Sequence, residues 1–408
     1  MNPPRQVDAA VRRERVVVVC TQYIGDTLLA IPFLRNLRRA LPDATIDVLA
    51  PGTGRSVLAA CPSIDELLAW QRPAGGRRGL VGGLSSLVGQ AAWIRSRGYD
   101  RAYLLKPSLS AAALVMLAGI PRRVGFTGEA GPLLTRRVRR RPGRHQVETY
   151  LDLLRVDGVA IDDARLENWV TPEATRRVDR LLAPLPSGRR RVFLAVRSTD
   201  GCKHWPVDRW AEVVRGLVVE RHCEVVLCGG PADAAAHADL VEAAGPLAAG
   251  HVHDCSAAVP LADVAALMKR MDLCVGVDTG LVHLAASVGV PCTVLVGPTD
   301  PNRWAPWRVA AEVLRSAEVR STMRERLLTA HGRVGSLRWP LGRGEMAGIT
   351  IRDVLAAVDR LLPDRGLRTL DLTTGSFRYE VISSPGAAPV ESPAAVTHAS
   401  KLSESVTA

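Results

Sequence analysis

A short apolar strand followed directly by a helix constrains the fold of this chain more than any other feature. Residues 273–277 have the composition of a buried strand and residues 280–286 that of a short apolar helix, with Asp278 and Thr279 in the turn between them. Open α/β sheets bind ligands at such turns, where the unpaired first N–H groups of the helix attract anions. The segment therefore predicts a parallel α/β fold with a ligand site at one edge of a sheet.

The same alternation occurs near the N-terminus. Residues 16–20 form a β-branched run, Leu29, Phe33 and Leu37 recur at helical spacing, and residues 44–50 supply a second strand. Two strands joined by a helix pair in parallel. The turn after the first strand lacks the G-x-G-x-x-G sequence of dinucleotide-binding folds, so the pattern disfavours a plain dehydrogenase.

A second series of strands and helices starts at residue 191. Strands are expected at 192–196, 224–230, 273–277 and 292–297, with helices around Trp210 and over 261–271. The chain has 408 residues, which is long enough for two domains. We expect an N-terminal domain over residues 1–175 and a C-terminal domain over 176–365. The tail, 366–408, is expected to be largely disordered because residues 383–408 are rich in Ser, Ala and Pro, although 369–382 alternate somewhat like a strand.

Composition narrows the class of partner. The net charge of +12 favours anionic partners, while 4% aromatic residues without a basic, aromatic-interleaved stretch disfavour nucleic acid. The eight cysteines are scattered, several in apolar segments, as in a reducing compartment. No hydrophobic signal precedes the first strand, and the longest uncharged run, 279–299, is interrupted by Gly289 and Pro291. We therefore expect a cytoplasmic protein with at most peripheral membrane contact.

Three groups of polar residues follow predicted strands and would meet in a cleft between the two domains. In the first, Asp26 follows Gly25 and could act as a general base or, alternatively, cap a helix that starts near Leu28. The second group, in the loop after the strand at 192–196, consists of Ser198, Thr199 and Lys203. Two hydroxyls and an ammonium suit a diphosphate, although a loop lysine can also simply be solvated.

The third group is the strand-to-helix turn described first. Thr279 and the N–H of Gly280 could hold a diphosphate, with Asp278 and His283 at its border. The alternative is an aspartate that caps the helix beside a packed histidine. Residues 251–255 contain ligand-type side chains, but no second ligand pair stands at a fixed spacing, so we predict no metal site.

These segments resemble the heptosyltransferases of glycosyltransferase family 9, which transfer heptose from ADP-heptose to the inner core of lipopolysaccharide. The resemblance runs from about residue 16 to about residue 362. Its segments are Ile24-Gly25-Asp26-Thr27-Leu28-Leu29, Lys203-His204-Trp205-Pro206, Cys228-Gly229-Gly230-Pro231, Asp278-Thr279-Gly280-Leu281-Val282-His283 and Gly297-Pro298-Thr299-Asp300-Pro301. It implies the α/β GT-B architecture, in which two Rossmann-like domains with parallel sheets face each other across a cleft. The acceptor would lie on the first domain and the nucleotide sugar mainly on the second.

The resemblance also implies catalytic roles. Asp26 would deprotonate the acceptor hydroxyl as it attacks the anomeric carbon with inversion. The hydroxyls at 198–199 and the ammonium of Lys203 would hold the diphosphate. Thr279 and the Gly280 N–H would neutralise the departing ADP, so no metal and no cofactor are expected.

Three further residues would complete the donor site. By the same resemblance, Asp278 would bind sugar hydroxyls, and His283 would bond a phosphate or fix Asp278. Family members often carry a glutamate after the Gly-Gly-Pro turn to bind the ribose, and here Asp233 is the shorter substitute.

The expected partners are a nucleotide-sugar donor and an anionic, lipid-linked glycan acceptor at the cytoplasmic face of the inner membrane, without nucleic acid. Arg77, Arg78 and the basic run at 136–144 could face the acceptor or serve as solubilising charge. Two alternatives remain open, a nucleotide-sugar epimerase of the same fold and a noncatalytic sugar-nucleotide-binding protein. An epimerase would need additional acid–base carboxylates in the cleft and no acceptor.

Overall fold

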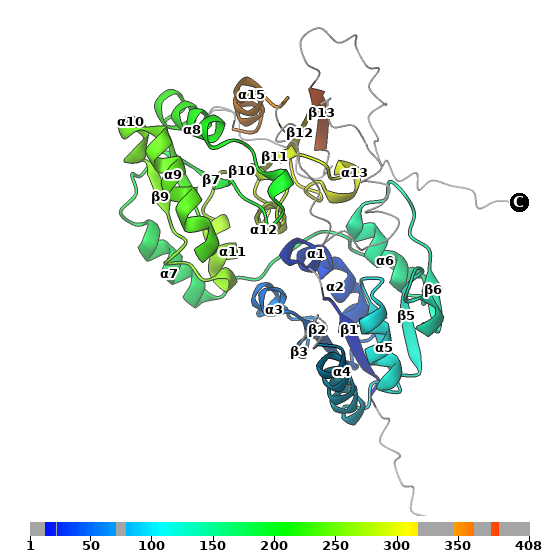
Figure 1. The fold of residues 1–408 in the computed structure, drawn as a ribbon. Helices are drawn as coiled ribbons and strands as arrows, with labels where there is room; N and C mark the ends of the chain where they lie inside the picture. The colour runs from blue at the N-terminus through cyan, green and yellow to red at the C-terminus, as the bar shows by residue number, and fades with distance from the viewer. Residues whose placement is uncertain are drawn as a thin grey trace, which may run out of the picture.

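The computed structural model describes residues 13–21, 23–70, 79–316, 346, 348–362 and 377–382. The chain folds into two lobes, each built around one parallel β-sheet that helices cover (Figure 1). The N-terminal lobe, blue to cyan in Figure 1, precedes the C-terminal lobe, green to red.

The first sheet is formed by β1 (Arg15–Val19), β2 (Thr45–Ala50), β3 (Glu66–Ala69), β4 (Arg101–Leu104), β5 (Arg122–Phe126) and β6 (Arg136–Val138). Its order is β3-β2-β1-β4-β5-β6, with every pairing parallel. Val16, Val17 and Val18 in β1 are 0% exposed. Helices on both faces bury such a central strand, which explains its continuous β-branched run.

The helices of the first lobe are α1 (Ile24–Leu29), α2 (Ile31–Ala40), α3 (Gly52–Leu58), α4 (Gly79–Ser96), α5 (Leu109–Leu117), the 3₁₀ turn η1 (Gly131–Leu133) and α6 (Gln146–Val156). The predicted helix after β1 is thus divided into α1 and α2. Pro32 stands in the first turn of α2, where its missing N–H costs no helical hydrogen bond, and Phe33 and Leu37 are buried as the spacing predicts.

The second sheet is formed by β7 (Arg190–Ala195), β8 (Cys223–Leu227), β9 (Val252–Asp254), β10 (Leu273–Val277), β11 (Cys292–Val296), β12 (Ala311–Ser316) and β13 (Phe377–Ile382). Its order is β13-β12-β11-β10-β7-β8-β9, again parallel throughout. The strand β13 lies within the predicted tail and pairs with β12 along its whole length. The rest of the tail that is predicted to be largely disordered, residues 366–376 and 383–408, lies outside the described residues.

The helices of the second lobe are α7 (Pro172–Leu182), η2 (Gly201–Lys203), α8 (Val207–Arg215), the π-helical turn η3 (Gly216–Glu220), η4 (Pro231–Asp233), α9 (Ala234–Ala244), α10 (Pro246–Ala249), η5 (Leu261–Asp263), α11 (Val264–Met268), α12 (Gly280–Ser287), α13 (Pro301–Trp304) and α15 (Ile351–Leu361). The helix predicted over 261–271 is shorter than expected, since it consists of η5 and α11. Helix α7 packs against α11, so the domain limit predicted at residue 175 falls inside a helix that contacts the second lobe. Within the described chain, no helix has the length and apolar character needed to cross a membrane.

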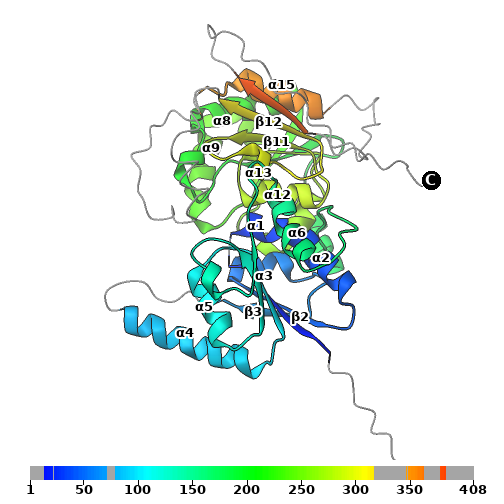
Figure 2. The ribbon, with the colours of Figure 1, turned by 90° about the vertical axis from the view of Figure 1, so that its right-hand side faces the viewer.

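The strand order brings the predicted site residues close to the reversal points of the two sheets. Each order reverses at one strand, because β1 lies between β2 and β4, and β7 lies between β8 and β10. At such a reversal the connections leave to opposite faces of the sheet, and a crevice opens at the carboxyl ends of the strands. Helix α1 follows β1, α12 follows β10, and the two helices meet between the lobes (Figure 2). The two reversal points therefore face each other.

Candidate active site

Asp26 lies in the first turn of α1, directly after the central strand of the first sheet. The helix begins at Ile24 with Tyr23 as its N-cap, so Asp26 does not cap a helix that starts near Leu28. Its Oδ1 accepts a hydrogen bond from the hydroxyl of Tyr150 in α6 at 3.2 Å. The residue as a whole is partly exposed, although its carboxylate is enclosed enough for burial to raise its pKa.

Three cations surround this carboxylate. Lys106 follows β4, Arg140 follows β6, and Arg303 comes from α13 in the second lobe. Burial raises the pKa of Asp26, while these three charges and the Tyr150 hydrogen bond offset part of the rise. Burial and the charge of Arg303 lower the pKa of Arg140 to about 10. A carboxylate with raised proton affinity suits a general base.

Asp278 follows β10, beside the reversal strand β7 of the second sheet, and one of its carboxylate oxygens is paired. Its Oδ2 accepts hydrogen bonds from Lys203 Nζ at 2.7 Å and from Thr299 Oγ1 at 2.7 Å. Burial alone would raise the pKa of Asp278, but Lys203, His283 and the two hydrogen bonds together bring it below its usual value. Lys203 also donates to the Asp278 carbonyl at 3.3 Å, which leaves one of its three N–H groups for a further acceptor.

His283 lies behind Asp278 on α12. Its Nε2 is 3.9 Å from Asp278 Oδ1. Burial lowers the pKa of His283, so the ring is neutral near pH 7. Its Nδ1 is buried and has no hydrogen-bond partner among the described residues. At 3.9 Å the ring makes no hydrogen bond to Asp278, and both predicted roles of His283, to bond a phosphate or to fix Asp278, remain predictions.

Helices α1 and α12 approach so closely that only glycine fits at the contact. A Cβ on Gly25 would lie 2.8 Å from His283 Cδ2, and a Cβ on Gly280 would lie 3.1 Å from the Gly25 nitrogen. Both distances are shorter than an ordinary van der Waals contact. The absence of a side chain at these two positions brings the turn that carries Asp26 against the N-terminus of α12.

Thr279 is the N-cap of α12, but its side chain makes no capping hydrogen bond. Its hydroxyl and the first N–H groups of the helix, beginning with that of Gly280, are therefore available to an anion. This is the arrangement predicted for the diphosphate, and the ligand roles of both residues remain predictions.

The loop after β7 carries the second predicted group. The structure brings Lys203 to Asp278, as described above, and leaves Thr199 exposed. Ser198 Oγ accepts the Asp200 N–H at 3.3 Å, and the Ser198 carbonyl is 2.8 Å from His204 Nε2. These contacts hold the loop in shape, and the diphosphate role of Ser198 and Thr199 remains a prediction.

Asp233 closes its own turn after β8. Its Oδ2 accepts the Gly230 N–H at 2.9 Å, and its Oδ1 is 3.5 Å from Arg197 Nε. A Cβ on Gly229 would lie 2.5 Å from Asp233 Oδ2, so the carboxylate is held tightly against this turn. A ribose could reach it only through its remaining lone pairs, and that role also remains a prediction.

The basic segments divide into three parts. Arg136 and Arg144 form ion pairs with Asp157 and Glu148 at 3.4 and 3.1 Å, and so serve the first lobe itself. Arg140 is the member of the run that lowers the pKa of Asp26. The predicted basic loop with Arg77 and Arg78 lies outside the described residues.

Three residues near Asp26 were not predicted from the sequence. The position of Lys106, directly after a strand at the reversal point, is a signal that could have identified it. Tyr150 and Arg303 carry no such signal, because each reaches Asp26 from a segment more than a hundred residues away. Their proximity follows from the packing of α6 and α13.

The histidines at 251 and 253 serve a structural ion network. Their ring nitrogens lie 2.9 and 2.7 Å from the two carboxylate oxygens of the buried Glu224. In the described part of the chain, no group of three or more His, Cys, Asp or Glu side chains could hold a metal ion.

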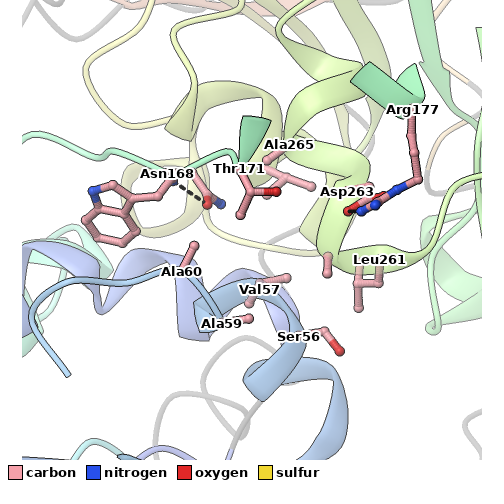
Figure 3. Close-up of a pocket in the computed structure, with 13 residues that line it drawn as sticks. Ser56, Val57, Ala59, Ala60, Asn168, Thr171, Arg177, Leu261, Asp263 and Ala265 are labelled. Atoms are coloured by element: carbon pink, nitrogen blue, oxygen red, sulfur yellow. Dashed lines mark hydrogen bonds and ion pairs between the residues drawn. The ribbon is translucent and has the colours of Figure 1, made fainter. Parts of the chain in front are cut away.

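A separate crevice of about 240 Å³ lies beside the segment that joins the lobes (Figure 3). Ser56 and Val57 of α3 form one wall, and Thr171, Asp263 and Ala265 lie opposite. None of the predicted site residues lines it. The polar groups at the α1–α12 contact, rather than this crevice, therefore define the candidate active site.

The sequence of this chain is similar to those of known glycosyltransferases. Residues 91–331 match glycosyltransferase family 9 (heptosyltransferase). Lipopolysaccharide heptosyltransferase 2 of Escherichia coli K12 is 27% identical over 311 residues, which cover 74% of this chain and 88% of that protein. Lipopolysaccharide heptosyltransferase 1 of Pseudomonas aeruginosa PAO1 is 30% identical over 306 residues, or 71% of this chain and 80% of the relative.

The fold has a counterpart among solved structures. E. coli ADP-heptose LPS heptosyltransferase II aligns with a TM-score of 0.68 at 22% identity, covering 86% of this chain and 100% of that chain. The predicted GT-B architecture of two facing Rossmann-like domains is thereby confirmed. Because the family match covers more than half of the sequence, this chain belongs to glycosyltransferase family 9, the heptosyltransferase family.

Proposed function

We propose that the protein transfers a heptose or a related sugar from an ADP-sugar to a hydroxyl group of a lipopolysaccharide core or another bacterial glycan. The proposal rests on the contact between α1 and α12, which sets Asp26 opposite the group formed by Lys203, Asp278 and Thr279. The similar E. coli structure is that of an ADP-heptose LPS heptosyltransferase, which supports an ADP-sugar as the donor.

In the proposed reaction, Asp26 takes the proton of the acceptor hydroxyl. The acceptor oxygen bonds to the anomeric carbon while the bond between that carbon and the diphosphate oxygen breaks. ADP leaves with the electron pair on the opposite face, so the configuration inverts. The raised pKa of Asp26 favours this proton transfer, because a base works best when its pKa approaches the working pH.

The second lobe would stabilise the leaving group. Lys203, the Thr279 hydroxyl and the first N–H groups of α12 would take up the charge of the departing ADP, with the hydroxyls of Ser198 and Thr199 in the same loop as Lys203. Asp278 would hold Lys203 in place and bind sugar hydroxyls. On this basis the transfer needs neither a divalent metal nor a cofactor.

The acceptor site would prefer an anionic acceptor. Lys106, Arg140 and Arg303 all interact with one carboxylate, Asp26, and the surplus positive charge there suits a carboxylate or phosphate next to the attacked hydroxyl. The net charge of +12 is consistent with action at the cytoplasmic face of the inner membrane, where a lipid-linked acceptor would lie.

The donor assignment can be tested by calorimetric titration of the protein with ADP, UDP and GDP in EDTA. We expect selective binding of ADP that weakens at least tenfold in Lys203→Ala, because the diphosphate loses a charge-assisted hydrogen bond. A preference for UDP, or no binding of any nucleotide, would contradict the donor assignment.

The reaction class needs a second experiment with ADP-heptose and lipopolysaccharide acceptors of increasing core length. Acceptor-dependent release of ADP with a lengthened glycan is expected. A new sugar epimer formed without acceptor would support the epimerase alternative, and binding without any turnover would support the noncatalytic one.

A further inference from the structure

Helix α6 connects the two lobes at the candidate active site. Its first residue, Gln146, accepts hydrogen bonds through Oε1 from Arg303 Nε at 2.9 Å and from Arg303 Nη2 at 2.7 Å. One turn further along, Tyr150 donates to Asp26 Oδ1 at 3.2 Å. Residues four apart on a helix lie on the same face, so α6 presents both contacts to the same region.

A second contact fixes the start of the same helix. His145, the N-cap of α6, stacks on Trp307 with ring centroids 4.2 Å apart, and its Nε2 is 3.0 Å from the Ala305 carbonyl. The His145 Nδ1 accepts the Val147 N–H, so Nε2 carries the proton that is donated to Ala305. Burial lowers the pKa of His145 to about 3, and this interlobe hydrogen bond therefore does not titrate near neutral pH.

The segment that α6 holds begins at the donor group. Thr299 donates to Asp278 Oδ2 at 2.7 Å, and Arg303 follows four residues later in α13. The guanidinium of Arg303 also lies over the Trp304 ring, 5.0 Å from its centroid. Residues 299–307 thus connect Asp278 in the donor lobe with α6, the helix whose Tyr150 is bonded to Asp26.

From these contacts we propose that Arg303, held by Gln146 one turn before Tyr150 on α6, is a positioning residue through which the docked 299–307 segment of the donor lobe acts on Asp26 in the acceptor lobe. This inference rests on the proposed function, in which Asp26 accepts the proton of the acceptor. With the segment docked, the charge of Arg303 from the second lobe favours the ionised form of Asp26 that the reaction requires. When the segment is withdrawn, the base loses that cation and binds a proton more tightly.

Several charged or titratable groups face Asp26 from the elements packed around it. They are Tyr150 on α6, Lys106 after β4, Arg140 after β6 and Arg303 on α13, while His283 lies beside the neighbouring Gly25 across the α1–α12 contact. Among the described residues, three cations are found to lower the pKa of Asp26, and of these Arg303 alone belongs to the donor lobe. Removing it therefore tests communication between the lobes, whereas removing Lys106 or Arg140 would test the acceptor lobe alone.

The first readout is the pH dependence of kcat/KM for the acceptor. In Arg303→Gln we expect the acidic limb to move up by roughly half a unit to one unit, because the folded pKa of Asp26 rises when a nearby cation is lost. Arg303→Lys should restore part of the shift, since it keeps the charge but not the bidentate contact. Gln146→Leu should move the limb in the same direction by a smaller amount, because the guanidinium is no longer held.

Arg308→Gln is the matched control. Arg308 lies over the Trp307 ring at 5.4 Å in the same segment, but it is not among the groups that shift the pKa of Asp26. Its acidic limb should equal that of the wild type. A loss of activity in Arg303→Gln with an unmoved limb would show that Arg303 is merely structural, and would overturn the inference.

The second readout does not depend on turnover. Selective ¹³C labelling of aspartate carboxylates, with the Asp26 signal assigned by its loss in Asp26→Asn, gives the pKa of Asp26 directly. We expect a higher value in Arg303→Gln than in the wild type or Arg308→Gln. An equal value would overturn the inference even if transfer is observed, and a shifted value in a protein that transfers no sugar would refute the proposed function alone.

Discussion

Asp26 and Asp278 both stand where a strand near the reversal point of its sheet ends, yet their surroundings push their proton affinities in opposite directions. Asp26 follows β1, the strand at which the order of the first sheet reverses, and Asp278 follows β10, the neighbour of the reversal strand β7 in the second sheet. The Asp278 carboxylate accepts hydrogen bonds from the ammonium of Lys203 and the hydroxyl of Thr299, each at 2.7 Å, and its pKa is lowered. Asp26 receives one hydrogen bond, from Tyr150, and its pKa is raised. Direct partners, rather than topology, therefore separate a candidate base from an anchored carboxylate.

The largest expected effect concerns the roles of these two carboxylates. Asp26→Asn should reduce transfer by about 10²–10⁴-fold, because it removes the proton acceptor, while the affinity for ADP stays within twofold. Asp278→Asn should instead weaken ADP binding, because Lys203 loses its partner. Calorimetry with ADP and a transfer assay on both variants measure this difference. Equal loss of ADP binding in the two variants would contradict the division of roles.

The next effect tests how firmly Asp278 depends on its pair. Lys203→Met should lower the free energy of unfolding by about 2–3 kcal/mol, because a buried carboxylate is left without its cation. Adding Asp278→Asn should recover much of that loss. Urea denaturation at pH 7 measures both, with Arg176→Met in the exposed Arg176–Glu173 pair as a control expected to change by less than about 0.5 kcal/mol. No recovery in the double variant would show that packing, not charge, causes the loss.

A smaller effect tests the contact that brings the two carboxylates together. Gly25→Ala should destabilise the protein by about 1–2 kcal/mol and lower kcat/KM, because its Cβ would lie 2.8 Å from His283 Cδ2 and push α1 away from α12. Gly52→Ala is the matched control, since a Cβ at the start of α3 meets nothing within 4 Å. Thermal unfolding and transfer rates of the two variants compare them. Identical behaviour would mean that the lobes adjust freely.

The smallest expected effect is a change in the free energy of unfolding that has opposite signs in the two aspartate variants. The folded pKa of Asp26 is raised, so its contribution to stability is present at low pH and is lost as the pH rises through that value. The folded pKa of Asp278 is lowered, so its contribution is present above about pH 4 and is lost as the pH falls through the folded value. At pH 7, Asp26→Asn should stabilise the fold by about 1 kcal/mol or less, and Asp278→Asn should destabilise it. Changes of the same sign in urea denaturation would contradict the opposed pKa directions.

Much of the architecture could be predicted from local sequence. The β-branched and apolar runs at β1, β10 and β11 identify central strands of parallel sheets, because only a strand covered on both faces remains apolar throughout. Boundaries were less accurate where short helices follow one another, as with η5 and α11. For the strand β13 the sequence offered only a weak strand-like alternation over residues 369–382, because its pairing with β12 is a long-range interaction.

The candidate site shows the same division. Asp26, Lys203 and Asp278 belong to short motifs at strand ends, where local geometry alone places polar groups at the edge of a sheet. The pairing of Lys203 with Asp278 joins residues 75 apart, and that of Tyr150 with Asp26 joins residues 124 apart. No periodicity encodes such contacts, so Tyr150 and Arg303 could not be recognised from the sequence.

The sequence by itself determined the strand-and-helix alternation, the family resemblance and the chemical groups that stand at the strand ends. Only the tertiary structure decided that Asp278 is paired with a cation, which lowers its pKa, and that Asp26 has a raised pKa. The physical reason is that burial and distance to counter-charges set a pKa, and both arise when the two lobes pack α1, α6, α12 and α13 together.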